Sequence, residues 1–408
     1  MASTGVGLAP PLVEEVFTQA AHDLETSALT SADSRLQVEA RAGDLELIDS
    51  IATEWHKLCG PGWCDQPFYL PEWIANSMRC FAPGQSLYLI TVRERSELCA
   101  VLPLYQKRTS WFGLPFRVLG GPASIGYGCR FDVIRGANTA AYEIAEAVWE
   151  HLKNSDQWDV IFLGKVPEGA TSEQLVPCAR RDGFSTLCYE QARSPYLRLR
   201  SGATANDFAR EGHFRRNLNR RWRKLEQKGL LRLRRVEELD RAAIRLFYSM
   251  EHHGWKGRKG SAIACDQAAL DFFDSTAESA ARAGYLALYF LDCDDKPIAA
   301  QFGLALGGVY YPIKTAFDEV YSAYSPGQLI TSAILQDCID RGFREVDFLG
   351  QWAQWKADWT DTVRPHYSCY IFRDSLKGRI LAASTKAEHA KEKLTDKVRD
   401  WVAKRSAR

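Results

Sequence analysis

The sequence lacks several features that would place it in a specialised class of protein. Its net charge is only +1, so no overall attraction to nucleic acid follows. Its 11 cysteines contain no C-x-x-C pair, which favours buried, reduced thiols over zinc sites or disulfides. No stretch approaches the roughly eighteen apolar residues of a membrane span, and the first residues lack the basic start and apolar run of a secretory signal. These absences predict a cytoplasmic enzyme or binding protein.

Several motifs that carry chemistry are also missing. The chain has no G-x-S-x-G nucleophile turn and no P-loop. His252 and His253 are adjacent, so on a helix their side chains point about 100° apart and cannot bind one ion together. We therefore expect no metal site.

What the sequence does contain is a repeat. The strand-like segments "WDVIFLGK" and "EVDFLGQ" each reach a glycine, Gly164 and Gly350. Asp132 precedes the first glycine by 32 residues, and Asp318 precedes the second by the same 32. With 408 residues and 46% hydrophobic content, the chain is long enough for about two to three domains. The spacing predicts two similar units that share a core.

Hydrophobic periodicity predicts helices and strands in both units. In the first unit we expect helices over 43–59 and 138–152, and strands over 87–92, 98–105, 116–119 and 158–163. In the second we expect helices over 207–228, 237–252 and 326–341, a loop over 254–260, and strands over 285–292, 298–306, 309–317, 345–349 and 367–372. This order predicts a mixed α/β sheet. The predicted division is a mobile arm over 1–36, units over 37–199 and 200–378, and a basic amphipathic helix over 379–408.

Four segments of the second unit together resemble a known family. They are "FRRNLNRRWRKLEQKG", "MEHHGWKGRKGSAI", "KTAFDEVYSAYSPGQLI" and "REVDFLGQWAQWKADW". They resemble the CelD-like and BioF2-like group of GNAT acyltransferases, which fuse two GNAT units as the Fem peptidyl transferases do. The resemblance implies a fold of two tandem GNAT-like mixed-sheet units sharing a central groove, and acyl-CoA as co-substrate. Where a typical GNAT enzyme has a Q/R-x-x-G-x-G/A loop around the pyrophosphate, this chain reads Ser325-Pro326-Gly327.

The start of the helix at 326–341 is the predicted donor site. Pro326 suits a first helical position, because it needs no amide donor there. The free amides and the helix dipole at such an end favour an anion. The predicted cofactor-binding residues are Ser325, Pro326, Gly327 and Gln328. An ordinary helix cap is the alternative. The first unit reads Thr139-Ala140-Ala141 at the equivalent positions, so we place the donor in the second unit.

A basic helix is the strongest charge feature. Residues 210–235 contain eleven Arg or Lys and two Glu. Arg216 and Arg220 fall on the face opposite the apolar stripe, where they can bind the phosphates of CoA or of tRNA. A solvated face paired with acids elsewhere is the alternative.

The glycine-bounded segment "GWKGRKG" predicts a surface loop with binding residues. Trp255 can stack on a ring or cover an acyl chain, and Lys256 can meet an anion, although a plain turn is equally compatible with the pattern. Glu251 is a candidate base, or else an exposed helix carboxylate.

The stretch "REVDFLGQWAQWKADW" carries the other catalytic candidates. Strand alternation turns Asp347 into an apolar layer, where it must be paired or keep its proton. Lys356 follows between Trp355 and Trp359, which can wall a dry pocket where an ammonium stabilises an oxyanion. By resemblance to the Fem-type enzymes, this lysine acts on the acyl group in transit. A surface lysine on an amphipathic turn is the alternative.

The sequence thus predicts an enzyme that moves an acyl group from acyl-CoA to an amine or hydroxyl of a polar acceptor. Asp318 is a further catalytic candidate, and Tyr311 and Lys314 are further substrate-binding candidates. The alternatives are an aminoacyl-tRNA-dependent Fem-type transferase and a non-catalytic binding protein of envelope polysaccharide assembly. The basic segment 384–408 can pack on the protein or rest on an acidic membrane surface.

Overall fold

The computed structural model describes residues 35–60, 64–111 and 113–406. The predicted arm over 1–36 lies outside the described residues except for its last two positions. Within the described chain, no helix combines the length and the apolar character that crossing a bilayer requires.

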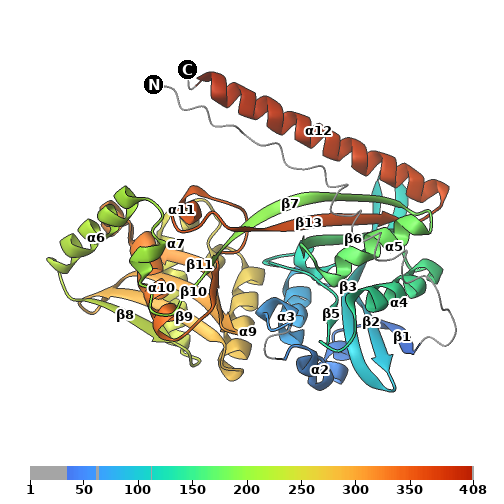
Figure 1. Ribbon diagram of the computed structural model, residues 1–408, viewed down its shortest axis with the longest axis horizontal. Coiled ribbons are helices and arrows are strands. Elements are labelled where there is room, and N and C mark those ends of the chain that lie inside the picture. The colour runs from blue at the N-terminus through green and yellow to red at the C-terminus, as the bar shows by residue number, and fades with distance from the viewer. Residues whose placement is uncertain (1–34, 61–63, 112, 407–408) are drawn as a thin grey trace.

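The first unit contains the elements up to β7, where η marks a short 3-10 helix (Figure 1). They are β1 (Leu36–Gly43), α2 (Glu46–Leu58), η1 (Pro67–Tyr69), α3 (Pro71–Phe81), β2 (Ser86–Glu94), β3 (Glu97–Trp111), β4 (Leu114–Gly120), η2 (Pro122–Ser124), β5 (Ile134–Arg135), α4 (Ala141–Asn154), β6 (Val160–Pro167), η3 (Thr171–Gln174), α5 (Leu175–Arg181) and β7 (Ser185–Arg198). The predicted helices correspond to α2 and α4, and the predicted strands to β2, β3, β4 and β6. The elements β1, α3, α5 and β7 were not predicted.

The second unit contains the remaining elements. They are η4 (Ala205–Phe208), α6 (Gly212–Glu226), β8 (Leu231–Val236), α7 (Arg241–His253), α8 (Trp255–Arg258), η5 (Ile263–Cys265), α9 (Gln267–Arg282), β9 (Leu286–Cys293), β10 (Lys296–Leu306), β11 (Val309–Phe317), η6 (Glu319–Tyr324), α10 (Pro326–Asp340), β12 (Glu345–Asp347), α11 (Gln354–Ala357), β13 (Val363–Phe372) and α12 (Leu376–Ser406).

Two predictions for this unit were wrong in detail. The segment 254–260, predicted as a loop, contains helix α8. The strand predicted over 345–349 ends at Asp347, because the next turn places Leu349 and Gly350 at φ 55° and 58°. Such left-handed conformations interrupt a strand. Helix α10, in contrast, begins at Pro326 as predicted, and Gly342 follows its end at φ 75°.

The repeat is visible in the order of elements. Strands β2, β3 and β4, helix α4 and strand β6 of the first unit correspond to β9, β10, β11, α10 and β12 of the second. In each unit the third strand pairs in parallel with the strand that follows the helix, β4 with β6 and β11 with β12. The predicted mixed α/β fold of two similar units is confirmed.

The two units share one sheet. Its order is β1-β2-β3-β4-β6-β13-β7-β12-β11-β10-β9-β8, with β5 beside β3. Strand β13, late in the chain, lies between β6 and β7, and β7 pairs in turn with β12 (Figure 1). The units therefore exchange strands, although the predicted boundary at 199 does follow the end of β7.

A hydrophobic core also joins the units. Helix α3 of the first unit packs against α9 of the second, and Trp73 meets Phe272 edge to face at 5.1 Å. Phe68 contacts Tyr311 of β11 at 5.2 Å between ring centroids. Tyr127, from the loop after η2, stacks on Phe272. Because one core contains side chains from both units, their relative position is fixed by packing.

The last helix, α12, lies across the long strands β7 and β13 (Figure 1). Leu381 and Ala382 pack against Val160 and Phe372. The side chains beyond position 395, together with Leu394, lie outside the described residues, so the predicted membrane contact of 384–408 stays a prediction.

Candidate functional site

The candidate site lies where β11 and β12 separate. The two strands are paired only at Val309 with Glu345 and at Tyr310 with Val346. Strand β11 then continues to Phe317, whereas β12 ends at Asp347. Strands that separate at their carboxyl ends leave a crevice in which α/β proteins commonly bind ligands.

A pocket of 740 Å³ occupies this crevice. Its lining comes from both units. The first unit contributes Gly126, Tyr127, Gly128, Cys129 and Lys165. The second contributes Trp255, Lys256, Pro312, Ile313, Thr315, Phe317, Ser322, Ser325, Pro326, Gly327, Gln328, Thr331, Phe348, Leu349, Gly350, Trp355 and Lys356. The pocket is therefore completed by residues distant in sequence.

The N-terminus of α10 opens into this pocket. Ser325 has the left-handed φ of 52°, and no side chain caps the helix. Pro326 occupies the first helical position, and the side-chain-free Gly327 comes next. An uncapped helix start presents its partial positive charge to whatever occupies the space in front of it. The predicted cofactor-binding residues Ser325, Pro326, Gly327 and Gln328 all line the pocket.

Gln328 links this helix start to the segment that follows β12. Its side-chain oxygen accepts a hydrogen bond of 2.8 Å from the indole nitrogen of Trp359. Its amide nitrogen donates to the Trp355 carbonyl and to Asp358, both at 3.2 Å. Trp359 itself is buried against Phe214 of α6. Gln328 therefore holds α10 and the Trp355–Lys356 wall in a fixed relation.

Lys356 is held by backbone carbonyls at the edge of the pocket. Its ammonium donates to the carbonyl of Leu349 and, at 2.9 Å, to that of Gln351. Leu349 and Gly350 form a left-handed turn directly before Gln351, whose carbonyl is the second acceptor. Only 8% of the lysine is exposed, and this burial lowers its pKa to about 8, against the opposing effect of Asp347. The ring of Trp355 lies 5.5 Å away.

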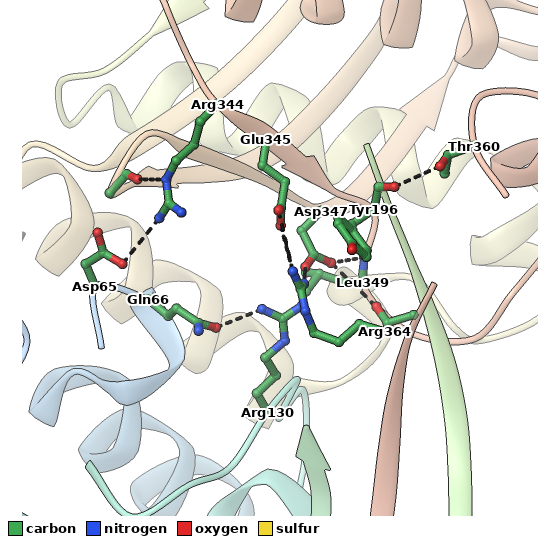
Figure 2. Close-up of polar contacts among 12 residues, drawn as sticks. Asp65, Gln66, Arg130, Tyr196, Arg344, Glu345, Asp347, Leu349, Thr360 and Arg364 are labelled. Carbon is green, nitrogen blue, oxygen red and sulfur yellow. Dashed lines mark hydrogen bonds and ion pairs between the residues drawn. The ribbon is translucent and has the colours of Figure 1, made fainter. Parts of the chain in front are cut away.

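Asp347 does not line the pocket but fixes the turn behind Lys356. It is fully buried, and Arg130 and Arg364 both donate to its carboxylate (Figure 2). Burial alone would raise its pKa, but the two arginines outweigh that effect and the pKa is lowered. Its other oxygen accepts from the Leu349 amide at 3.0 Å. Arg130 belongs to the first unit, so this ion pair also connects the units.

Glu251 is likewise buried and engaged. It accepts from Lys256 at 2.8 Å and from the Ile263 amide at 2.8 Å, and Lys314 lies 3.6 Å from it. Lys256 lines the pocket and also donates to the Thr315 carbonyl at 2.7 Å. Burial lowers the pKa of Lys256, against the raising effect of Glu251.

Three other predicted residues are not part of the pocket lining. Asp318 caps η6 through the Val320 amide at 3.0 Å and pairs with Lys296 at 2.9 Å. Tyr311 is only 2% exposed and belongs to the shared core. Lys314 lies over the Tyr127 ring at 4.9 Å.

The predicted phosphate-binding arginines occupy the exposed face of α6. Arg216 and Arg220 are exposed and form no ion pair within the described part of the chain. This helix lies at the end of the second unit that is far from the first (Figure 1). It packs on η6 and α10, which places its charge near the elements that line the pocket.

The residues contributed by the first unit were missed at the level of sequence. Lys165 follows Gly164 of the repeat and has a left-handed φ of 57°. Gly128 cannot carry a side chain, because an added Cβ would lie 2.4 Å from the Ala123 backbone. The sequence "LGK" at the end of the first repeat could have drawn attention to Lys165. The spacing of the repeat, however, did not predict that this lysine lines the pocket of the other unit.

The equivalent place in the first unit differs from the pocket. Asp132, the counterpart of Asp318, is partly buried and accepts from the amides of Thr171 and Ser172. A second pocket, of 830 Å³, borders the approach to α4 at Thr139, and its lining includes Glu54, Glu94 and Glu97 together with Lys57 and Arg95. Unlike the first pocket, it is therefore lined by charges of both signs. Among the described residues no cluster of His, Cys, Asp and Glu is arranged to hold a metal.

Comparisons with known proteins agree with this arrangement. Residues 212–357 match the family described as "Acetyltransferase (GNAT) domain". The crystal structure of FemX aligns with 82% of this chain and 98% of its own, at 10% identity and a TM-score of 0.53.

Two further structures align less closely. L-PGS from Bacillus licheniformis aligns with 85% of this chain and 97% of its own, at 10% identity and a TM-score of 0.48. The tandem GNAT protein from the clavulanic acid biosynthesis pathway aligns with 82% of this chain and 98% of its own, at 12% identity and a TM-score of 0.43. The comparison with curated proteins found no match. Residues 212–357 thus match a GNAT acetyltransferase domain, and the likeness to FemX shows a similar fold over both units. The CelD-like subgroup stays a prediction.

Proposed function

We propose that the protein transfers an acyl group from acyl-CoA to an amine or hydroxyl of a polar acceptor. One observation carries the proposal: the uncapped start of α10 and the ammonium of Lys356 line the same pocket, inside the GNAT domain. The first is suited to bind phosphate, and the second to stabilise negative charge on a carbonyl oxygen.

In this proposal the start of α10 binds the pyrophosphate of the donor. The thioester then lies in the crevice between β11 and the turn after β12. The acceptor nitrogen or oxygen attacks the thioester carbon, and the new bond forms as negative charge moves to the carbonyl oxygen. The C–S bond then breaks, and the proton that the acceptor loses balances the one that the CoA thiolate gains.

Lys356 is the group that we assign to the oxyanion. An ammonium has three N–H donors, and two of them are used by the Leu349 and Gln351 carbonyls. The third is available to the pocket. Burial strengthens such an interaction, because the dry surroundings screen it less than water does.

Asp347 and Glu251 receive positioning roles rather than the predicted proton transfer, and Asp318 receives no role in catalysis. All three carboxylates are engaged by cations and backbone amides. None of them lines the pocket. Asp347 positions Lys356 through the turn at Leu349, and Glu251 positions Lys256.

The test is ligand-induced stabilisation followed by turnover. Acetyl-CoA and longer acyl-CoAs should raise the melting temperature, and thiol release should require an acceptor amine. Gly327→Asp should abolish the thermal shift by placing a carboxylate at the anion site. The matched control is Ala141→Asp at the equivalent position of α4, which should keep the shift. No acyl-CoA shift in the unaltered protein would refute the proposal.

An aminoacyl-tRNA donor is the second candidate. Arg216 and Arg220 favour it, because they are exposed on α6 without an ion pair to any described residue, and such a basic face suits a polyanion. A thermal shift with tRNA that falls steeply with salt, and no shift with acyl-CoA, would select this donor. A glycan or lipid precursor that binds without any transfer would select the predicted non-catalytic alternative instead.

A further inference from the structure

The pocket carries positive charge without negative charge. Lys165, Lys256 and Lys356 line it, and its described lining contains no Asp, Glu or His. The chain as a whole has a net charge of only +1. Three lysines around one cavity are therefore a local feature of this site, and they require an explanation beyond the overall composition.

The surrounding charges do not cancel this surplus. Lys256 and Lys314 share the single carboxylate of Glu251. On the other side, Arg130 and Arg364 are balanced by Asp347 and by Glu345, which pairs with Arg364. Four lysines against Glu251 leave an excess of three positive charges near the cavity (4 − 1 = 3). An anionic occupant would balance them.

The ammonium of Lys165 is positioned to bind a ligand rather than a carboxylate of the protein itself. Its ammonium donates to the Gly128 carbonyl at 2.5 Å and forms no ion pair with any described residue. The loop that holds it is anchored, because Tyr127 packs against the rings of both Phe272 and Phe273 of α9. An ammonium fixed by one carbonyl keeps two donors for the pocket.

The donor does not account for all of this charge. In the function proposed above, the start of α10 binds the pyrophosphate and Lys356 meets the thioester oxygen. Lys165 comes from the other unit, and Lys256 comes from the helix after α7. Lys165 therefore remains without an anion, and Lys256, which shares Glu251 with Lys314 and also donates to the Thr315 carbonyl, keeps one donor for the pocket.

We propose that the acceptor carries a carboxylate or a phosphate beside its nucleophile, and that Lys165 and Lys256 bind this anion. The inference rests on the proposed acyl transfer and specifies its acceptor class. The first unit then contributes to acceptor specificity through Lys165, while the second unit holds the donor and contributes Lys256. Binding of this kind is a charge-assisted contact in a partly desolvated pocket, where it discriminates strongly against neutral analogues.

The experiment uses matched amines on the full chain, saturated with CoA for the thermal shift and with acetyl-CoA for thiol release. Glycine is compared with glycinamide, and phosphoethanolamine with ethanolamine, by thermal shift and by thiol release from acetyl-CoA. We expect the anionic member of at least one pair to have a KM at least about tenfold lower than its neutral partner. Preference within the first pair indicates a carboxylate, and preference within the second a phosphate.

Variants connect the preference to the lysines. Lys165→Met should raise the KM of the anionic amine to that of the neutral one while the acetyl-CoA shift persists, and Lys165→Arg should restore most of the preference. Lys107→Met, at an exposed position of β3, is the matched control and should change nothing. Equal KM values within both pairs, or a preference that survives Lys165→Met, would overturn the inference. If acetyl-CoA does not raise the melting temperature of the unaltered protein, that result overturns instead the proposed acyl transfer on which the inference rests.

Discussion

At the scale of single residues, the protonation of Lys356 decides whether the proposed chemistry works. Burial lowers its pKa to about 8, although Asp347 acts in the opposite direction. The charged form has a donor left for the substrate, whereas a neutral amine would have only two N–H groups, which the two carbonyls already use. The oxyanion role therefore requires the protonated state.

This requirement gives a pH dependence with a definite sign. At saturating substrates kcat should fall by about tenfold per pH unit once the pH rises above the pKa of Lys356. Lys356→Arg should lower kcat and remove the alkaline fall, because a guanidinium keeps its proton. A kcat that instead rises through pH 8 would identify the neutral amine as a base and contradict the oxyanion role.

At the scale of elements, strand β13 depends on a buried neutral histidine. His366 lies where β13 passes between β6 and β7, and it is 3% exposed. Its Nδ1 donates to the Arg364 carbonyl at 3.0 Å, and its Nε2 accepts from Arg130 at 3.3 Å. Burial, with the nearby Arg130, lowers its pKa to about 4.

Because the pKa of His366 is lower in the folded state than in the unfolded state, the free energy of unfolding decreases as the pH falls. The contribution of neutral His366 is complete above its unfolded pKa of about 6.5 and is lost progressively towards about 4, which amounts to about 3 kcal/mol. His366→Gln should flatten the pH dependence of unfolding between these values. Chemical denaturation at several pH values measures it, with His213→Gln at an exposed position as the control. An unchanged slope in His366→Gln would contradict this role.

At the scale of the whole molecule, the two units form one cooperative structure. A single sheet runs through both, β13 of the second unit is inserted beside β6 of the first, and the aromatic core is shared. The ion pair of Arg130 with Asp347 lies at the same junction (Figure 2). Neither unit can therefore unfold without exposing apolar surface and strand edges of the other.

Removing the charge at this junction should destabilise the entire protein. Asp347→Asn leaves Arg130 buried without its carboxylate, whereas Arg364 keeps Glu345, and the loss should lower the free energy of unfolding by about 3–5 kcal/mol. Calorimetry should still record one transition. Asp318→Asn removes the partly exposed pair with Lys296 and should cost only about 0–1 kcal/mol. Two separate transitions in either variant would contradict a shared cooperative unit.

The sequence by itself determined the features that depend on local pattern. Helix α10 follows from Pro326 at its start and Gly342 beyond its end, because each suits its backbone conformation without any distant partner. The repeat follows from equal spacings, and the basic face of α6 from helical periodicity. Lys356 beside a tryptophan was also visible, although its carbonyl partners were not.

Only the tertiary structure decided what distant segments do together. Strand β7 contains charged residues and Pro195, which weaken a strand pattern, and its partners β12 and β13 lie more than a hundred residues later. The pairing of Asp347 with Arg130, and the approach of Lys165 to a pocket in the other unit, have the same origin. Local propensity carries no information about such contacts, since they form only when two strands separate in one unit and a loop of the other closes the gap.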